Sequence, residues 1–163
     1  MGGGDNQAGI TLSILDRLTD LEPDSNVEGR TSSWDEMRQF KAALCRDLAA
    51  LFNTRRAEQD FDPSFEQATN SLLTFGIADF TSFNLKNAIE QERVRRSIEH
   101  AIRRFEPRLA RVTVTLELPD SVSPVLRFQI DGLLRTGSSS QPVLFNATLH
   151  HDSRQVAVAG GNS

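Results

Sequence analysis

Residues 98–116, IEHAIRRFEPRLARVTVTL, combine the end of a helix, a proline corner and the start of a strand. Ile98, Ile102 and Phe105 recur at steps of three and four residues, so they share one face of a helix. Pro107 has no backbone N–H and disfavours helical dihedrals at the residue before it. We therefore expect the helix to end one or two residues before this proline.

A strand follows the corner. Val112, Val114 and Leu116 alternate with polar residues, a pattern typical of a half-buried strand. Glu106 and Arg108 flank the proline, so the stretch predicts two charges held in a fixed geometry between two packed elements.

The composition is that of an ordinary globular domain. The chain has 163 residues, 38% hydrophobic and 25% charged, which suits one domain with a real core. A formal net charge of −4 argues against a dedicated nucleic-acid binder. Charge is nevertheless uneven, because seven of the 18 basic residues lie within Arg93–Arg111.

Few residues could support a disulfide, a metal or a cofactor. Cys45 is the single cysteine, so no intramolecular disulfide can form, and its apolar neighbours suggest a near-core position. Three histidines and one cysteine offer a zinc site few ligands, and we expect no cofactor. The sequence shows no signal peptide and no apolar run of membrane-spanning length. We expect a cytoplasmic protein without membrane insertion.

The chain divides into two tails and one domain. Residues 1–31 are predicted to form a flexible tail that carries a short amphipathic helix at 10–18. Ile14, Leu15 and Leu18 give this helix an apolar face, which docks either on its own domain or on a partner. Residues 32–158 are predicted to form a single α+β domain, and 159–163 a disordered end.

Two helices are expected in this domain. The first begins at the S-x-x-E capping box of Ser33 and Glu36 and runs to Phe52, with one apolar stripe. The second spans 87–105 and is expected to turn Ile89 inward with its other apolar residues and to leave its charges, Glu99 among them, mainly outside. The strands are expected at 109–118, 125–134, 143–149 and 155–158. Short turns between successive strands predict a small, mainly antiparallel sheet, on which the helices pack.

No catalytic signature is present. The chain lacks a phosphate loop, HExxH, GxSxG and a close Cys/His arrangement. Acid pairs for glycoside hydrolysis can be nominated from the carboxylates at 58, 60, 62, 66 and 106, but their separation does not follow from sequence.

An ordered set of short stretches carries a resemblance to a known family. The stretches are SILDRL at 13–18, DL at 47–48, LFNTRR at 51–56, SLL at 71–73, FGI at 75–77, DF at 79–80, FEPRL at 105–109 and LRF at 126–128. Together they resemble the TssE family of baseplate proteins from bacterial type VI secretion systems, with its tailed-phage wedge relatives. The likeness covers about residues 10–150 in the same order.

The resemblance implies a non-enzymatic structural subunit in a hetero-oligomeric complex. In that family the protein joins a wedge with TssF and TssG beside TssK, at the inner face of the cell envelope. Its fold is similar to the handshake domain of the TssB–TssC sheath, whose polymerisation begins on it. The family's interaction motif falls on Glu106, Pro107 and Arg108, and we expect Arg103 and Arg104 to add to that surface. Alanine at 106 and 108 should then leave the fold intact and block assembly.

Three alternatives stay open. Glu106 and Arg108 can form a local cap and salt bridge that only holds the corner. Phage relatives have been labelled tail lysozymes, so a peptidoglycan hydrolase is the alternative function. The arginine cluster at 93–111 could instead bind an acidic partner or nucleic acid. Wedge stoichiometry, the pairing of individual strands with neighbours, and the target cells do not follow from the sequence.

Overall fold

The computed structural model describes residues 33–56, 65, 67, 71–79, 87–117, 125–136, 139–149 and 155–161. Its elements are α2 (Ser33–Asn53), η1 (Leu72–Thr74), α4 (Ala88–Phe105), β1 (Leu109–Glu117), β2 (Leu126–Thr136), β3 (Ser139–Leu149) and β4 (Val156–Gly160). The predicted α+β fold, with its helices and its antiparallel sheet, is confirmed. The tail and the helix expected at 10–18 lie outside the described residues, as do the capping side chains of Ser33 and Glu36.

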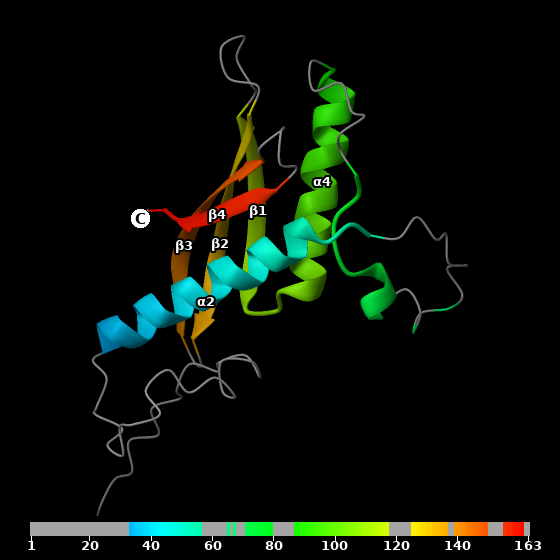
Figure 1. Ribbon diagram of the computed structural model, residues 1–163. Coiled ribbons are helices and arrows are strands. Elements are labelled where there is room, and N and C mark those ends of the chain that lie inside the picture. The colour runs from blue at the N-terminus through cyan, green and yellow to red at the C-terminus, as the bar shows by residue number, and fades with distance from the viewer. Residues whose placement is uncertain are drawn as a thin grey trace, which may run out of the picture.

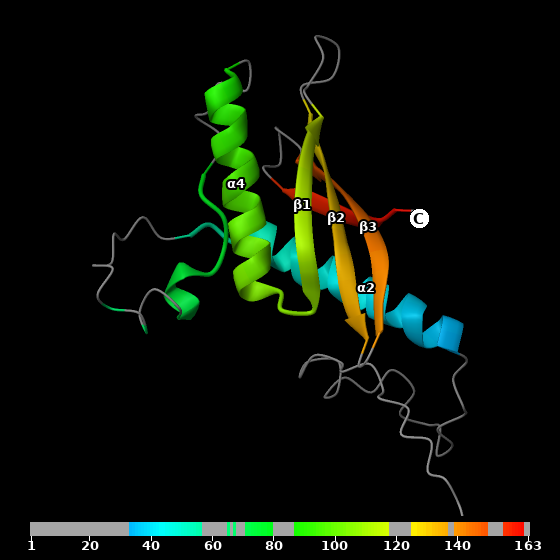
Figure 2. The ribbon, with the colours of Figure 1, turned by 180° about the vertical axis from the view of Figure 1, so that it is seen from behind.

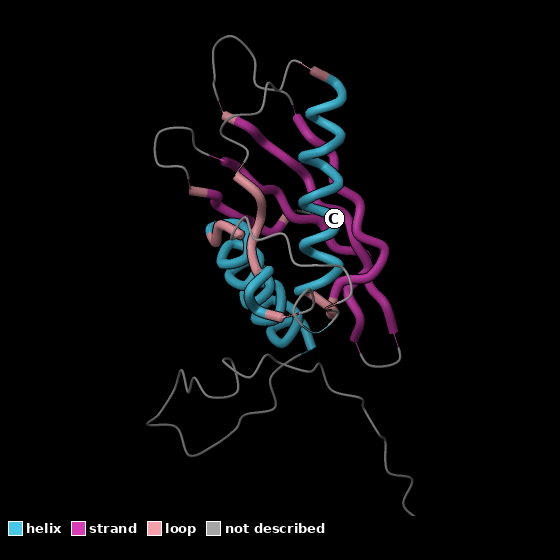
Figure 3. Tube along the Cα trace, turned by 90° about the vertical axis from the view of Figure 1, so that its right-hand side faces the viewer, coloured by secondary structure: helices cyan, strands magenta, loops and turns pink. Residues whose placement is uncertain are grey.

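The four strands form a meander in the order β1-β2-β3-β4, and every neighbouring pair is antiparallel. Val114 pairs with Ile130, which pairs with Phe145, so one apolar row crosses three strands. Between Ala110 and Thr113 the β1 register shifts, and Arg111 has a φ of 51°, in the left-handed region that non-glycine residues rarely adopt. Such a bulge increases the local twist of a strand. The side view shows that the sheet as a whole is twisted (Figure 3).

The two helices take different positions on the sheet (Figures 1 and 2). Helix α2 crosses one face, and α4 runs alongside the edge strand β1, to which the corner connects it. The contacts between elements agree with this arrangement: α4 packs mainly on β1, and α2 packs mainly on β4. The β1 edge is therefore covered by a helix, and β4 forms the other edge of the sheet.

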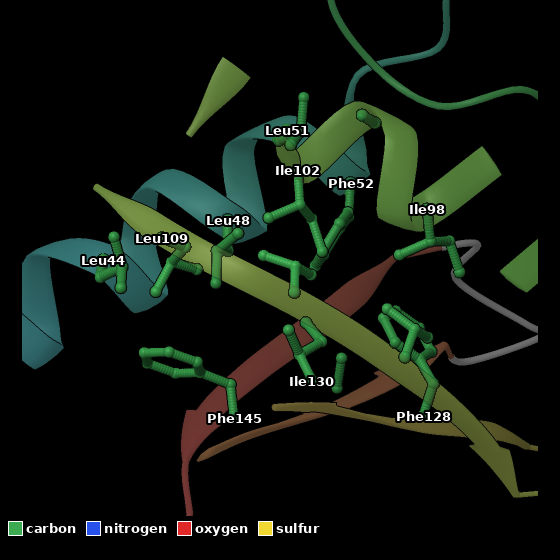
Figure 4. Packing of buried hydrophobic residues seen from close by; sticks show 14 of the residues in the cluster. Leu44, Leu48, Leu51, Phe52, Ile98, Ile102, Leu109, Phe128, Ile130 and Phe145 are labelled. Atoms are coloured by element: carbon green, nitrogen blue, oxygen red, sulfur yellow. The ribbon is translucent and has the colours of Figure 1, made fainter. Parts of the chain in front are cut away.

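One hydrophobic core joins both helices to the sheet (Figure 4). Its labelled members come from α2 (Leu44, Leu48, Leu51, Phe52), α4 (Ile98, Ile102) and the strands (Leu109, Phe128, Ile130, Phe145). The rings of Phe52 and Phe128 meet edge to face, with centroids 5.5 Å apart. Alternation along β1 follows the prediction, since Val112 and Val114 are buried and the residues next to them are exposed. Strands β2 and β3 alternate in the same way.

Two predictions for α4 are wrong. Ile89 was expected inward but is 69% exposed, because it lies in the first turn, just after the N-cap residue Asn87. Glu99 was expected outside but is only 6% exposed. Its carboxylate reaches the backbone of β1, a tertiary contact that helical periodicity does not encode.

Strand limits differ slightly from the expected ones. Strand β3 begins at Ser139, before the expected start at 143, because Ser139 and Ser140 pair with the end of β2. Strand β4 runs to Gly160, beyond the expected end at Val158. The predicted limits of the domain and its tails stay predictions.

Gly76 fixes the path of the chain that follows η1. The N–H of Ile77 donates to the Thr54 carbonyl, and the N–H of Arg56 donates to the Ile77 carbonyl, both at 3.0 Å. Gly76 has a φ of +108°, and a Cβ on it would lie 2.2 Å from the carbonyl oxygen of Thr54. Only glycine fits this close backbone approach.

Candidate interaction site at the helix–strand corner

The corner between α4 and β1 has the predicted geometry. Helix α4 ends at Phe105, and the N–H of Glu106 still donates to the Ile102 carbonyl at 2.8 Å. After Pro107, the N–H of Leu109 donates to the Glu106 carbonyl at 3.1 Å and begins β1. Backbone hydrogen bonds therefore continue through the turn on both sides of the proline.

Glu106 and Arg108 form a buried ion pair across Pro107. Arg108 Nε donates to Glu106 Oε1 at 2.6 Å, and Nη2 donates to Oε2. The backbone N–H of Arg108 also donates to Oε1, at 3.2 Å. Glu106 is 4% exposed, whereas Pro107 is exposed. The two charges point into the molecule, and the proline ring faces out.

Helix α2 completes this cluster. Arg108 Nη2 donates to Asp47 Oδ2 at 2.6 Å, and the guanidinium carbon lies 5.5 Å from the ring centroid of Phe40. Burial lowers the pKa of Arg108, but hydrogen bonds to Glu106 and Asp47 outweigh it, so the net shift is upward. Arg108 is therefore a permanent cation that links the corner to α2.

This geometry supports the local role that the sequence left open for Glu106 and Arg108. The two charges pair with each other within the chain, although Arg108 Nη1 is buried without a hydrogen-bond partner among the described residues. The burial of the pair leads us to expect that alanine at either position lowers stability. A docking role for the same corner stays a prediction.

Among the described residues, the structure does not bring the other predicted interaction residues together with this ion pair. Arg103 donates from Nη2 to the Val112 carbonyl at 2.9 Å and to Glu99 Oε2 at 3.3 Å, so it faces β1 rather than the ion pair. The guanidinium carbon of Arg104 lies 5.3 Å from the ring centroid of Phe105. Its Nε and Nη2 are buried without a hydrogen-bond partner in the described part of the chain. Ile14, Leu15 and Leu18 lie outside the described residues.

The described residues offer little for catalysis. They contain no cluster of three or more histidine, cysteine or acidic side chains that could hold a metal. A hollow on the sheet is lined by one carboxylate, Glu117, among polar strand side chains such as Arg127 and Asn146, so it holds no acid pair. Glu106 is engaged with Arg108, and the other nominated acids lie outside the described residues. Within the described part, no helix is long and apolar enough to cross a membrane.

Sequence reasoning missed three polar residues that position the corner and the sheet edges. They are Asp47, Asn53 and Glu99, and each acts on a residue distant in sequence. Asp47 and Asn53 lie within stretches that carry the family resemblance, which is the one signal that could have singled them out.

The fold and the corner define a small α+β protein, in which the polar cluster of Asp47, Glu106 and Arg108 has a structural role: it links the corner to α2. A family model described as "Baseplate wedge protein gp25" matches residues 38–139, more than half of the chain. The chain belongs to this family of baseplate wedge proteins, and the family predicted from its sequence motifs is confirmed. Its role is therefore that of a structural baseplate component.

Two further comparisons complete the picture. No curated protein sequence matches the chain. Among solved structures, the chain is similar to one described as "The baseplate complex from the type VI secretion system". That similarity has 18% sequence identity and a TM-score of 0.49, and it covers 71% of this chain and 98% of the other.

Proposed function

We propose that the chain is a wedge subunit of a type VI secretion baseplate, on which the contractile sheath begins to polymerise. Its partners on this proposal are the baseplate subunits TssF, TssG and TssK and the sheath subunits TssB and TssC. It works in the cytoplasm, with the assembled baseplate at the inner face of the envelope. Family membership supports the baseplate role, and the open edge of strand β4 is the observation that supports sheath initiation.

Strand β4 can accept another strand along its outer side. Just beyond β4, the N–H of Gly161 donates to the Leu144 carbonyl of β3 at 2.8 Å. Because hydrogen-bonded positions alternate along an antiparallel pair, Ala157 and Ala159 of β4 also point their backbone groups at β3. The backbone groups of Val156, Val158 and Gly160 then point away from the sheet. Those of Val158 and Gly160 have no hydrogen-bond partner in the described residues, and a Cβ on Gly160 would meet open space. An unpaired edge of this kind is a template for strand addition.

Asn53 occupies the start of the same edge. Its side-chain amide donates to the Val156 carbonyl at 3.0 Å and accepts from the Val156 N–H at 2.8 Å. One side chain thus replaces a pairing residue of a neighbouring strand. An added strand would pair with Val158 and Gly160, beyond this amide.

The corner supports the proposal in a different way. Glu106 and Arg108 hold Pro107 outward at the junction of α4 and β1. We assign to Pro107 the contact with a neighbouring subunit, and to the ion pair the positioning of that contact. Arg103 and Arg104 lie on the last turn of α4 beside it.

A proline at Val158 tests sheath initiation. Val158→Pro removes the outward N–H but none of the bonds to β3, so the sheet is retained while an incoming strand loses a donor. Val158→Ala shortens the side chain and keeps the N–H, so it is the matched control. Fluorescent sheath in cells should be lost in Val158→Pro and retained in Val158→Ala. Normal sheaths with folded Val158→Pro would contradict the role of this edge.

A further inference from the structure

The outer edge of β1 is closed by side chains of α4. The N–H of Val114 donates to Glu99 Oε1 at 3.0 Å, and the carbonyl of Val112 accepts from Arg103 Nη2 at 2.9 Å. These are the backbone groups that an additional strand would need, because β1 pairs with β2 on its other side. A carboxylate oxygen and a guanidinium take the places of a carbonyl and an N–H.

Glu99 is held in this position by two arginines. Arg95 Nη1 donates to Oε1 at 2.5 Å, and Arg103 Nη2 donates to Oε2 at 3.3 Å. The carboxylate is nearly inaccessible, whereas the side chain of Arg103 is more than half exposed. The acceptor at the edge is therefore fixed and water-excluded, and its donor partner borders solvent.

The β1 edge carries a second feature that opposes pairing. The bulge between Ala110 and Thr113 interrupts the regular spacing of backbone groups beside Val112, the residue that Arg103 binds. Bulges and charged side chains are devices by which natural sheets prevent edge-to-edge association. The two sheet edges therefore differ, since β1 is closed over its middle and β4 is open beyond Val156.

We infer that Glu99 and Arg103 close a latent strand-pairing edge on β1, and that without them β1 pairs with β1 of a second copy of this chain. The inference concerns the isolated chain, so its test needs no baseplate or sheath. It also determines which edge of the sheet can accept a strand, because strand addition is confined to β4 while Glu99 and Arg103 close β1.

The test uses the full chain as Glu99→Ala/Arg103→Ala, with Arg93→Ala on the exposed side of the same helix as control. Sedimentation velocity over a concentration series measures self-association, and hydrogen exchange measures protection of the Val114 amide. The double variant should form dimers at concentrations where wild type and Arg93→Ala do not. At concentrations where the double variant is still monomeric, its Val114 amide should exchange at least about tenfold faster, since the N–H loses its acceptor, and dimerisation should restore its protection.

Disulfide trapping identifies the edge that pairs. In a Cys45→Ala background, Thr113→Cys or Thr115→Cys reports β1–β1 pairing, because residues opposite each other in paired strands bring their Cβ atoms within disulfide reach. Ala159→Cys reports pairing through β4. Trapping at 113 or 115 in the double variant alone is the expected result.

Three outcomes would overturn the inference. One is a folded double variant that stays monomeric, because the body of α4 then closes the edge by itself. Another is trapping at 113 or 115 in the wild-type background. The third is dimerisation of the double variant through Ala159→Cys alone. If the double variant does not fold, Glu99→Gln/Arg103→Ala, which keeps an acceptor for Val114 but frees the Val112 carbonyl, is judged by dimerisation and disulfide trapping alone.

Discussion

Arg108 donates a hydrogen bond of 2.6 Å from Nη2 to Oδ2 of Asp47, which precedes it by 61 residues. The same guanidinium also binds Glu106, so one side chain joins the end of α4, the start of β1 and the middle of α2. The corner is thereby fixed relative to the helix that crosses the sheet.

Removal of Arg108 should destabilise the protein strongly. Arg108→Ala leaves the carboxylate of Glu106, 4% exposed, buried without its partner. We expect the free energy of unfolding to fall by about 3–5 kcal/mol, as for other broken buried pairs. Urea unfolding followed by circular dichroism measures it. Arg93→Ala, on the exposed face of α4, should change it by less than about 0.5 kcal/mol. Equal stability of Arg108→Ala and wild type would contradict the positioning role of the pair.

Gly76 should not tolerate a side chain. Gly76→Ala combines a φ of +108° with a Cβ placed 2.2 Å from the Thr54 carbonyl oxygen. The strained φ alone costs about 1–3 kcal/mol, and the clash adds to it. Gly160→Ala is the matched control, because its Cβ would have no neighbour within 4 Å. A thermal melt should separate the two variants clearly, and similar melting temperatures would refute the assigned backbone approach.

Asn53 should anchor the start of β4. Asn53→Ala removes both hydrogen bonds to Val156, and we expect a loss of about 1 kcal/mol in stability. Hydrogen exchange should quicken at the Val156 amide and stay unchanged at Val114, which lies on the opposite edge. Asn53→Asp should be worse than alanine, because it places a charged acceptor oxygen against the Val156 carbonyl, which is also an acceptor. Unchanged protection at Val156 would show that packing alone holds the strand.

Glu92 should titrate far below an ordinary glutamate. Hydrogen bonds from Arg95 and Arg96 lower its pKa from 4.5 to about 2. A lowered pKa favours the folded state above pH 4.5, and this contribution is lost as the pH falls from 4.5 through about 2. Carboxyl NMR titration should show Arg95→Ala shifting the pKa of Glu92 upward. Arg93→Ala removes a neighbouring charge but neither of these hydrogen bonds and should leave it unchanged. An ordinary pKa in the wild type would contradict the pairing.

The sequence predicted those features that depend on neighbouring residues. Pro107 marked the end of α4, and the alternation of Val112 and Val114 marked β1, because helix breaking and strand periodicity are local properties. Glu99 could not be placed in the same way. Helical periodicity assigned it to solvent, but β1 supplies a buried N–H for it to accept.

The polar contacts at the corner and at the sheet edge depend on tertiary structure. The side chain of Asp47 meets Arg108 only once α2 has packed on the sheet, and the amide of Asn53 meets Val156 for the same reason. The motif at the corner drew attention to Glu106 and Arg108, but their burial follows from the packing of three elements. The sequence motif identified Glu106 and Arg108, but neither their partner Asp47 nor the inward orientation of the charges.

Co-purification tests the central claim most directly. The full chain, co-expressed with TssF, TssG and TssK, would be passed over a size-exclusion column with light scattering to measure the mass of its complex. The account predicts that the chain elutes in a stable hetero-oligomer with the wedge subunits, far above its own mass of 18.1 kDa. Elution of a folded chain alone at 18.1 kDa, beside an assembled complex that lacks it, would contradict the account.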